Sequence, residues 1–432
     1  MLCTRGYKYE LQLNNKERTQ LTNCAGTARF AWNWGLAERL RRYRERTGNG
    51  RYTDAMKQHK LLNGLKKTEF LWMYKVSKCI PQEALRNLDQ AFQNYYRDRK
   101  AAQATKRKPR VGFPKFKKKH QTKDSFRLTG TIKVFPPTKR VQLPRLGQLR
   151  VKEAPLFPPA ARILSATVSR TADRWYVAFT VEEEQLEPPP DLRFEKVLGL
   201  DAGLARFATL SSGFPIPKPL FLLKRVKKLQ RLSKAHSRKQ YGSNNRRKSA
   251  RKLARFHQRV ANTRKDFQHK LSLTLVKNHG VLIVEDLFVK GLIQNKKHSR
   301  HWADLAHGEF QRLLKYKGKK HGTLLVEADR WFPSSRLCSN CLGYHRELTL
   351  KDRMFCCPFC GLELDRDYNA ALNLEQYFYC FILWQITKLI PVAESSAETL
   401  NACEEMVRPV VLQAHLHEAG RQTLTKRGHK RP

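Results

Sequence analysis

The chain has 432 residues, of which 41% are hydrophobic, so it is long enough for more than one folded domain and too apolar to be disordered. Its 85 Lys and Arg residues against 37 Asp and Glu give a formal net charge of +48. Such an excess repels itself unless a polyanion neutralises it, which favours nucleic acid as the partner. An anionic membrane surface is the alternative, but we expect no membrane partner. No apolar run of about 18 residues is present, so no membrane-spanning helix is expected. The start, MLCTRGYKYELQL, lacks a signal-peptide core, so we expect a cytoplasmic protein.

The first predicted elements are one strand and two helices. Residues 7–13 alternate polar and apolar side chains, which predicts a short strand. A helix is predicted over 16–46, where Thr47-Gly-Asn-Gly50 ends it, and a second helix begins near Pro81. The apolar residues of the second helix share one face, which favours core packing for that face.

A basic segment, KRKPRVGFPKFKKK at 106–119, follows the second helix. Eight of its fourteen residues are Lys or Arg, and its two prolines argue against a continuous helix. Phe113 and Phe116 are interleaved with the charges, which favours phosphate neutralisation with base stacking over a merely solvated surface. The candidate nucleic-acid contacts of this segment are Lys106, Arg107, Lys108, Arg110, Lys115, Lys117, Lys118 and Lys119.

Short strands separated by turn residues are predicted over 126–184. This pattern is typical of a small β-barrel or sheet, which the first strand could join. The Glu-Pro-Pro-Pro-Asp run at 187–191 predicts a linker. We therefore expect a first domain at 1–190, a β-barrel with a helical segment of about 16–100 inserted in it.

Two apolar strands of the second half each end in a carboxylate. KVLGLD ends at Asp201 and VLIVE ends at Glu285, while a third acid, Asp367, stands at the start of an Asn-Ala-Ala helix. An unpaired buried charge is costly, and divalent cations with oxygen ligands would explain all three acids together. Each acid alone is more often a helix cap or a turn residue, and three other acids remain alternatives: Asp286, Asp329 and Asp365.

Between these two strands, residues 224–265 predict a basic helical hairpin that turns at Tyr241-Gly-Ser-Asn-Asn245. No acidic residue lies between Ala202 and Lys265. Helices with so little internal salt-bridge support need an external anion, so we interpret the hairpin as a nucleic-acid surface. Its candidate contacts are Arg246, Arg247, Lys248 and Arg251. After the second strand, a helix over 301–320 and a strand over 323–327 are predicted.

The most specific motif is a pair of CxxC sequences, Cys338/Cys341 and Cys357/Cys360, separated by fifteen residues. This spacing is typical of a zinc ribbon, in which four thiolates hold Zn²⁺ tetrahedrally. We do not count Cys356 as a zinc ligand, because Cys357 and Cys360 already have the two-residue gap that a zinc knuckle needs. A closed four-sulfur site is structural, so we expect this zinc to be distinct from any catalytic metal.

Four motifs in this order resemble the TnpB family, the OrfB proteins of bacterial and archaeal insertion sequences and relatives of the type V CRISPR effectors. They are Gly199-Leu-Asp-Ala-Gly203, Ile283-Val-Glu-Asp-Leu287, the two CxxC pairs, and Asp365-Arg-Asp-Tyr-Asn-Ala-Ala371. The resemblance extends over about residues 5–375.

The resemblance implies an α/β multidomain protein. A RuvC-like nuclease domain of RNase H-like fold would span 191–375, with the basic hairpin at 218–270 and the inserted zinc ribbon at 334–364. The N-terminal β-barrel would be the wedge, and its inserted helices the recognition segment. Residues 376–432 would be a basic tail, expected to be partly disordered.

The resemblance also implies an RNA-guided DNA endonuclease associated with transposition, in which Asp201, Glu285 and Asp367 hold two catalytic Mg²⁺ ions. The family places its third acid directly before x-Asn-Ala-Ala, which selects Asp367 over Asp365. Expected partners are a guide RNA from the transposon end and double-stranded target DNA with a short adjacent motif, in a prokaryotic nucleoid. The oligomeric state is open. Two alternatives are a guide-dependent DNA-binding regulator that does not cut, and a cut-and-paste transposase, whose usual acid order of Asp, Asp, Glu differs.

Overall fold

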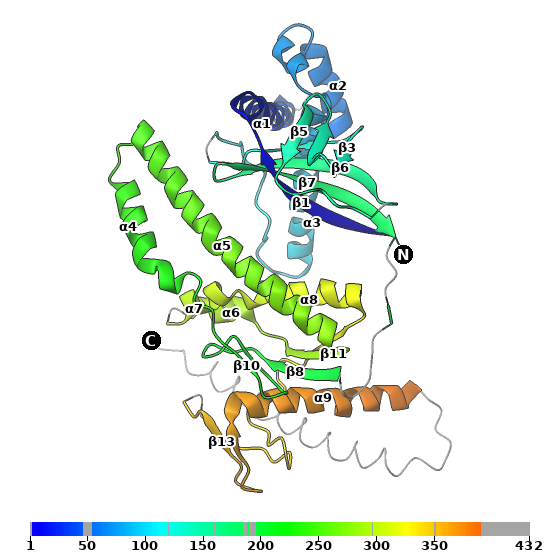
Figure 1. Cartoon of the computed structure of the whole chain (residues 1–432). Coiled ribbons are helices and arrows are strands. Elements are labelled where there is room, and N and C mark those ends of the chain that lie inside the picture. Colours follow the sequence, from blue (N-terminus) through cyan, green and yellow to red (C-terminus); the bar gives the residue numbers. More distant parts are fainter. Residues whose placement is uncertain are drawn as a thin grey trace, which may run out of the picture. The chain divides into compact units, whose positions relative to one another are not determined.

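The computed structural model divides into two compact units, Met1–Gln185 and Leu186–Pro432, each with its own core (Figure 1). The residues that it describes are 2–45, 54–119, 121–158, 160–184, 188–189, 196–295, 297–349 and 351–389, the last ten of them as backbone only. None of the described helices combines the length and the apolar character needed to cross a membrane.

An antiparallel sheet of seven strands forms the centre of the first unit, in the order β2-β6-β7-β1-β5-β4-β3. The longest strands pair with each other: β1 runs antiparallel to β7 from Leu2 to Glu10, and its last residues turn to pair with β5. The strands are β1 (Leu2–Gln12), β2 (Ser125–Leu128), β3 (Lys133–Phe135), β4 (Arg140–Leu143), β5 (Gly147–Val151), β6 (Arg162–Thr171) and β7 (Arg174–Glu184). Within the described residues, β2 and β3 are the edges of this sheet and are not paired with each other, so the predicted closed barrel is not confirmed.

Helices inserted between β1 and β2 cover this sheet: α1 (Asn15–Glu45), α2 (Ala55–Leu65), the 3-10 helix η1 (Leu71–Lys75) and α3 (Cys79–Ala104). A reciprocal cap begins α1, because the Asn14 side chain accepts from the Glu17 backbone N–H and the Glu17 carboxylate accepts from the Asn14 N–H, both at 2.8 Å. The predicted helices are confirmed as α1 and α3. No helix was predicted at α2 or η1, and the predicted turn at 47–50 lies outside the described residues.

The second unit is built on a five-stranded sheet in the order β10-β9-β8-β11-β12. The central strand β8 is parallel to β11, which is parallel to β12, whereas β9 and β10 continue the sheet in antiparallel fashion. The strands are β8 (Val197–Asp201), β9 (Ala208–Leu210), β10 (Pro215–Ile216), β11 (Val281–Glu285) and β12 (Leu324–Ala328).

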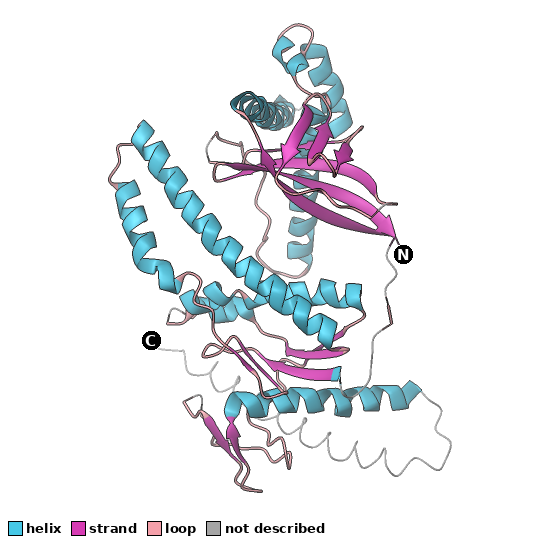
Figure 2. Ribbon diagram, in the orientation of Figure 1, coloured by secondary structure: helices cyan, strands magenta, loops and turns pink. Residues whose placement is uncertain are grey.

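Helices cover both faces of this sheet, and strand alternation decides which residues face which helix (Figure 2). Leu198 and Leu200 of β8 pack in one cluster with Leu275 of α5 (Asn244–Asn278) and Phe310 of α8 (His307–His321). Val197 packs on the opposite face, in the cluster that contains Leu374 and Phe378 of α9 (Arg366–Leu389). Odd-numbered positions of β8 and β11 therefore face α9.

Gly199 allows α9 to lie directly on β8. A Cβ atom at this position would stand 2.1 Å from the carbonyl oxygen of Ala371 and 2.7 Å from the backbone nitrogen of Glu375. No side chain fits in that space, so the backbone of α9 is in contact with the strand that ends in Asp201.

The predicted basic hairpin is confirmed as α4 (Val226–Ser237) and α5, which follow the short 3-10 helix η3 (Leu223–Arg225). Leu229 and Leu232 of α4 pack with Phe256 and Val260 of α5, and the hairpin extends away from the sheet (Figure 1). Ser243 caps α5 by accepting the Arg246 N–H at 3.1 Å.

The single helix predicted over 301–320 is wrong. The chain forms α6 (Val289–Gln294), α7 (Ser299–Leu305) and then α8, because Ala306 adopts the left-handed conformation with φ 53° and separates α7 from α8. The two-stranded ribbon β13 (Met354–Cys356) and β14 (Glu363–Asp365) leads into α9, which continues to Leu389 and so extends into the stretch 376–432 that was expected to be a tail. The expected disorder of the tail beyond 389 lies outside the described residues.

Candidate functional site

Two of the three predicted acids end adjacent parallel strands. Val284 of β11 pairs with Leu200 of β8, so the residues that follow them, Glu285 and Asp201, stand side by side. Both occupy odd-numbered positions, which face α9. The third acid, Asp367, lies in the first turn of α9, so the three acids come together at the carboxyl edge of the sheet.

Their electrostatic environment supports this proximity. The pKa of Asp201 is raised well above its ordinary value, first by burial and then by the negative charges of Glu285 and Asp367. Burial also raises the pKa of Glu285, while the Ser334 hydroxyl donates to its Oε1 at 2.7 Å and opposes that shift. Carboxylate oxygens are donors that Mg²⁺ prefers, and a divalent cation would offset the repulsion among the three acids.

The alternative acids have other partners. Asp365 Oδ1 accepts the backbone N–H groups of Asp367 and Tyr368, both at 3.1 Å, and pairs with Arg206 at 3.0 Å. Asp365 is therefore the N-cap of α9 and orients the turn that carries Asp367. Asp286 forms an ion pair with Arg330 and is 45% exposed.

The four predicted zinc cysteines form one cluster, with all four sulfur atoms within 4.8 Å of one another. Cys338 Sγ lies 3.6 Å from Cys360 Sγ, and Cys341 Sγ lies 3.5 Å from Cys357 Sγ. Four sulfurs at about 2.3 Å from a tetrahedral Zn²⁺ would be roughly 3.8 Å apart, so the donor set fits zinc. Cys356 is exposed and is not part of the cluster. No other group of three or more His, Cys, Asp or Glu in the described ranges is gathered so tightly.

Two buried asparagines join the ribbon to α9. Asn369 donates to Leu337 O at 2.6 Å and accepts from Ser339 N at 3.0 Å, on either side of Cys338. Asn373, one turn later, donates to the carbonyl oxygens of Ser334 and Leu337, both at 2.7 Å. One face of α9 thus holds the zinc ribbon. The same face also binds the backbone of Ser334, whose hydroxyl orients Glu285. Sequence reasoning missed this role, although two asparagines at i and i+4 in an apolar helix were a usable signal.

The basic segment 106–119 is fastened to the first unit. Asp98 Oδ2 accepts the backbone N–H groups of Arg110 and Val111 at 2.6 and 2.8 Å, and its Oδ1 pairs with Arg107. Asn33 exchanges two hydrogen bonds with the backbone of Lys117. We call this segment the basic strap.

Most charges of the basic strap are exposed, but two of its predicted contacts are used internally. Arg107 is ion-paired, and Lys117 Nζ lies 3.6 Å from the centroid of the Trp32 ring, where burial lowers its pKa to about 8. Phe113 packs edge-to-face on Phe92 and Tyr95, whereas Phe116 remains 48% exposed. The six candidates that stay exposed are Lys106, Lys108, Arg110, Lys115, Lys118 and Lys119.

The other basic candidates stand at the beginning of α5 in the second unit. Arg247, Lys248 and Arg251 are exposed. Arg246 is half-buried, since its guanidinium donates to Lys239 O at 2.8 Å and lies 5.6 Å from the centre of the Tyr241 ring. Arg246 therefore closes the hairpin turn, and its three neighbours present charge to solvent.

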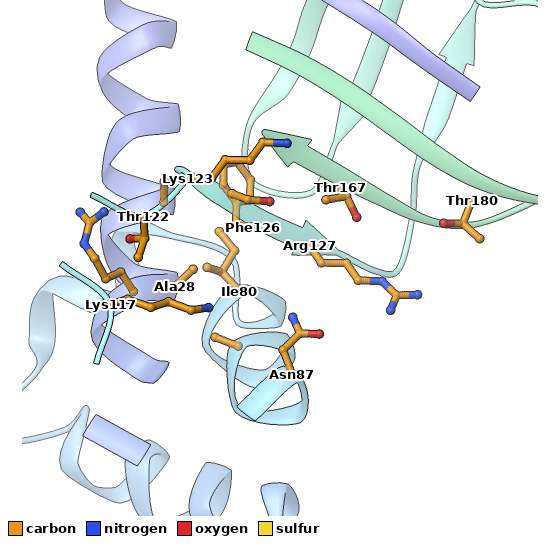
Figure 3. Close-up of a pocket in the computed structure, with 14 residues that line it drawn as sticks. Ala28, Ile80, Asn87, Lys117, Thr122, Lys123, Phe126, Arg127, Thr167 and Thr180 are labelled. Atoms are coloured by element: carbon orange, nitrogen blue, oxygen red, sulfur yellow. The ribbon is translucent and has the colours of Figure 1, made fainter. Parts of the chain in front are cut away.

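A cavity of about 380 Å³ lies in the first unit between the helices and the sheet (Figure 3). Asn87 of α3 and Lys117 of the basic strap line it opposite Thr167 and Thr180 of the sheet. Lys123 and Arg127 add positive charge to a lining that contains no acidic residue. The cavity suits an anionic, hydrogen-bonding ligand such as a phosphate.

Three family models match the chain. OrfB_IS605, described as "Probable transposase", matches residues 177–296, and "Cas12f1-like, TNB domain" matches residues 307–374. The third, described as "Helix-turn-helix domain", matches residues 1–48. In this structure, residues 2–45 form one strand and one long helix rather than two helices joined by a turn.

Curated relatives match over most of their length. A protein from Streptomyces pristinaespiralis named "Putative RNA-guided DNA endonuclease" is 32% identical over 372 residues, which are 86% of this chain and 88% of the relative. The Escherichia coli (strain K12) protein of the same description, InsQ, is 29% identical over 385 residues, 86% of this chain and 91% of the relative. Among solved structures, the Cas12f1–sgRNA–target DNA complex matches with a TM-score of 0.51 and 12% identity, covering 87% of this chain and 99% of that chain, which shows a shared fold.

Proposed function

Because the chain belongs to the TnpB/OrfB family of insertion-sequence proteins, we propose that it is an RNA-guided endonuclease that hydrolyses phosphodiester bonds of target DNA. One observation carries the proposal: Asp201, Glu285 and Asp367 approach one another from two strands and a helix at a single sheet edge. Folding does not require three acids there, because each places a charge at a partly buried position.

The proposed fold of the second unit is RuvC-like, which is the RNase H-like arrangement. Its support is the order β10-β9-β8-β11-β12, with antiparallel strands on one side of β8 and parallel strands on the other. For the first unit we propose the wedge and recognition role, with a sheet and inserted helices that hold guide RNA and DNA.

In the proposed chemistry, Asp201, Glu285 and Asp367 would hold two Mg²⁺ ions, which would supply an activated water and stabilise the leaving 3′ oxygen. The chain's own residues orient these ligands. Ser334 donates to Glu285 Oε1 and fixes that carboxylate. Asp365 fixes the helix turn from which Asp367 extends.

The partners that we propose are a guide RNA from the transposon end and double-stranded target DNA with a short adjacent motif. Support comes from the relatives' names and from the exposed charges of the basic strap and of α5. The basic cavity beside Lys117 is a further place for a phosphate of either nucleic acid. A cytoplasmic, nucleoid-associated location is part of the same proposal.

The test uses the protein purified with its accompanying RNA and DNA that matches this RNA. Replacing Asp201 by Ala should lower Mg²⁺-dependent cleavage by at least about 100-fold, because a metal ligand is lost, while RNA and DNA binding persist. Cleavage is measured on labelled duplex DNA.

The control is Asp266→Asn, which changes an acid of the same unit that is 62% exposed and paired only with Lys270 one helical turn away. This variant should cut normally. Undiminished cleavage by Asp201→Ala would remove the catalytic assignment. DNA binding without cleavage by the unmodified protein would favour the regulator alternative.

A further inference from the structure

A cavity of about 270 Å³ opens beside Glu285 in the second unit. It lies between the segments that follow β11 and β12, and Leu374 of α9 also lines it. Its apolar walls are Leu287, Phe288, Leu292, Phe332 and Leu374. Because Glu285 itself lines the cavity, any ligand held there lies next to the proposed catalytic carboxylates.

Phe288 is held in place and yet uncovered. Its side chain is 55% exposed. A Cβ atom at Gly291 would stand 2.4 Å from the ring, so the ring lies against bare backbone. The Arg330 guanidinium is 5.6 Å from the ring centre and is itself held by its ion pair with Asp286. A fixed, exposed aromatic ring at a nucleic-acid site is a platform on which a base can stack.

The charges around the cavity favour a base over a phosphate. Three carboxylates line it, those of Glu285, Asp286 and Asp329, against one cation, Arg330, which already pairs with Asp286. This lining repels an anion. Apolar walls suit a flat neutral ring, and carboxylates accept hydrogen bonds from the exocyclic amine of a base such as cytosine.

We propose that this cavity holds one unstacked nucleobase of the DNA strand being cut, stacked on Phe288. The proposal rests on the nuclease function proposed above. Extracting one base from its neighbours costs free energy, which stacking on an aromatic side chain offsets. A base held beside Glu285 fixes the strand in register, so that one particular phosphate reaches the carboxylates.

The first test measures DNA cleavage with a change in the protein, a change in the DNA, and both changes together. Target DNA carries a single abasic site, moved one position at a time across the cleavage region. For the unmodified protein we expect one position at which the abasic site slows cutting by roughly 5- to 150-fold, the range for one stacked base. Phe288→Ala should slow cutting of intact DNA by a similar factor and should no longer respond to that abasic site.

Two variants control this test. Phe288→Trp keeps a stacking face and should retain both cutting and the abasic response. Phe359→Ala removes a ring of the same type that is 70% exposed on the zinc ribbon, and it should behave as the unmodified protein does. If Phe288→Ala loses its zinc or melts early, Phe288→Leu replaces it, since leucine keeps apolar volume without a π face.

A second measurement separates failure of the cavity from failure of the nuclease. A DNA strand with 2-aminopurine at the sensitive position, or at each position in turn, is bound without Mg²⁺ and its fluorescence is recorded. A position-specific change that disappears in Phe288→Ala supports the cavity even if no cleavage is ever seen. Equal fluorescence and equal cutting for the two proteins would overturn the cavity proposal and leave the nuclease proposal intact.

Discussion

Two aspartates only two positions apart have different roles because of their surroundings. Asp365 Oδ1 accepts two backbone N–H groups and pairs with Arg206. The charge of Asp367 raises the pKa of Asp201 more than the charge of Asp365 does. Residue spacing alone left the choice between them open, and only the resemblance to the family selected Asp367.

Replacing Asp365 tests this division. Asp365→Ala removes the N-cap of α9 and should cost about 1 kcal/mol of local stability. The amides of Asp367 and Tyr368 should then exchange with solvent about fivefold faster, as measured by hydrogen exchange. Asp365→Asn keeps an acceptor and should exchange nearly as the unmodified protein does. Equal acceleration in both variants would mean that the charge opposite Arg206, rather than the cap, is decisive.

The basic strap shows at the scale of one element how a highly charged segment is ordered. Its prolines prevent a helix, and its charges repel one another, so its fixed path depends on side chains from other elements. Asp98 of α3 and Asn33 of α1 supply the hydrogen bonds, and Trp32 donates to Lys115 O at 3.0 Å. The strap is thus a preformed surface, which lowers the entropy lost when it contacts nucleic acid.

Asp98 should make the order of the strap depend on pH. The N–H of Val111 and the Arg107 side chain lower the pKa of Asp98 to about 2, against an ordinary value of 3.8. A carboxyl group with a lowered pKa stabilises the folded state above the ordinary value and loses this effect as pH falls through the lowered one. The backbone amides of the strap should therefore stay protected from hydrogen exchange at pH 4 and lose this protection as the pH falls toward 2.

Asp98→Asn should loosen the strap at neutral pH, where trypsin should cut it faster within 106–119. Glu153→Gln, a change at an exposed acid of the same unit, is the matched control and should leave the rate unchanged. Proteolysis and amide exchange at Arg110 and Val111 measure the effect. An unchanged cutting rate in Asp98→Asn would show that Asn33 and Trp32 suffice.

Strand alternation and metal-ligand spacing were the strongest signals in the sequence. Continuous apolar runs predicted the strands that end in Asp201 and Glu285, alternation predicted the first strand, and CxxC spacing predicted the clustering of four cysteines, because all of these depend on local patterns. The break at Ala306 had no such signal, since alanine rarely adopts a positive φ and only tertiary packing selects it. Ser334 was missed for a similar reason: a serine on a loop gives no hint that it will meet a carboxylate 49 residues away.

Net charge is the property of the whole molecule that most constrains its behaviour in solution. With 85 Lys and Arg against 37 acids, association with nucleic acid should be driven largely by counterion release. On duplex DNA, log K should fall against log salt with a slope of about −0.9 for each phosphate neutralised.

Changing Arg246, Arg247, Lys248 and Arg251 to Gln should reduce the magnitude of this slope by up to about 3.6, which is four times 0.9. Fluorescence anisotropy across a range of salt concentrations measures it. The control changes Lys319 and Lys320, exposed in the last turn of α8, to Gln. If the slope is the same for the four-site variant and the unmodified protein, the start of α5 is not part of the interface.

The covalent path from Cys360 to Asp367 is only seven residues long, and Asn369 and Asn373 bind the helix at its end back to the ribbon. Removing zinc would loosen the segment between Cys360 and Asp367, which positions Asp367 as the third proposed ligand of Mg²⁺. A chelator that strips both ions would therefore abolish cutting by two routes at once. Add-back of Mg²⁺ alone should fail to restore activity after zinc is lost, whereas brief treatment that spares the thiolates should be fully reversible.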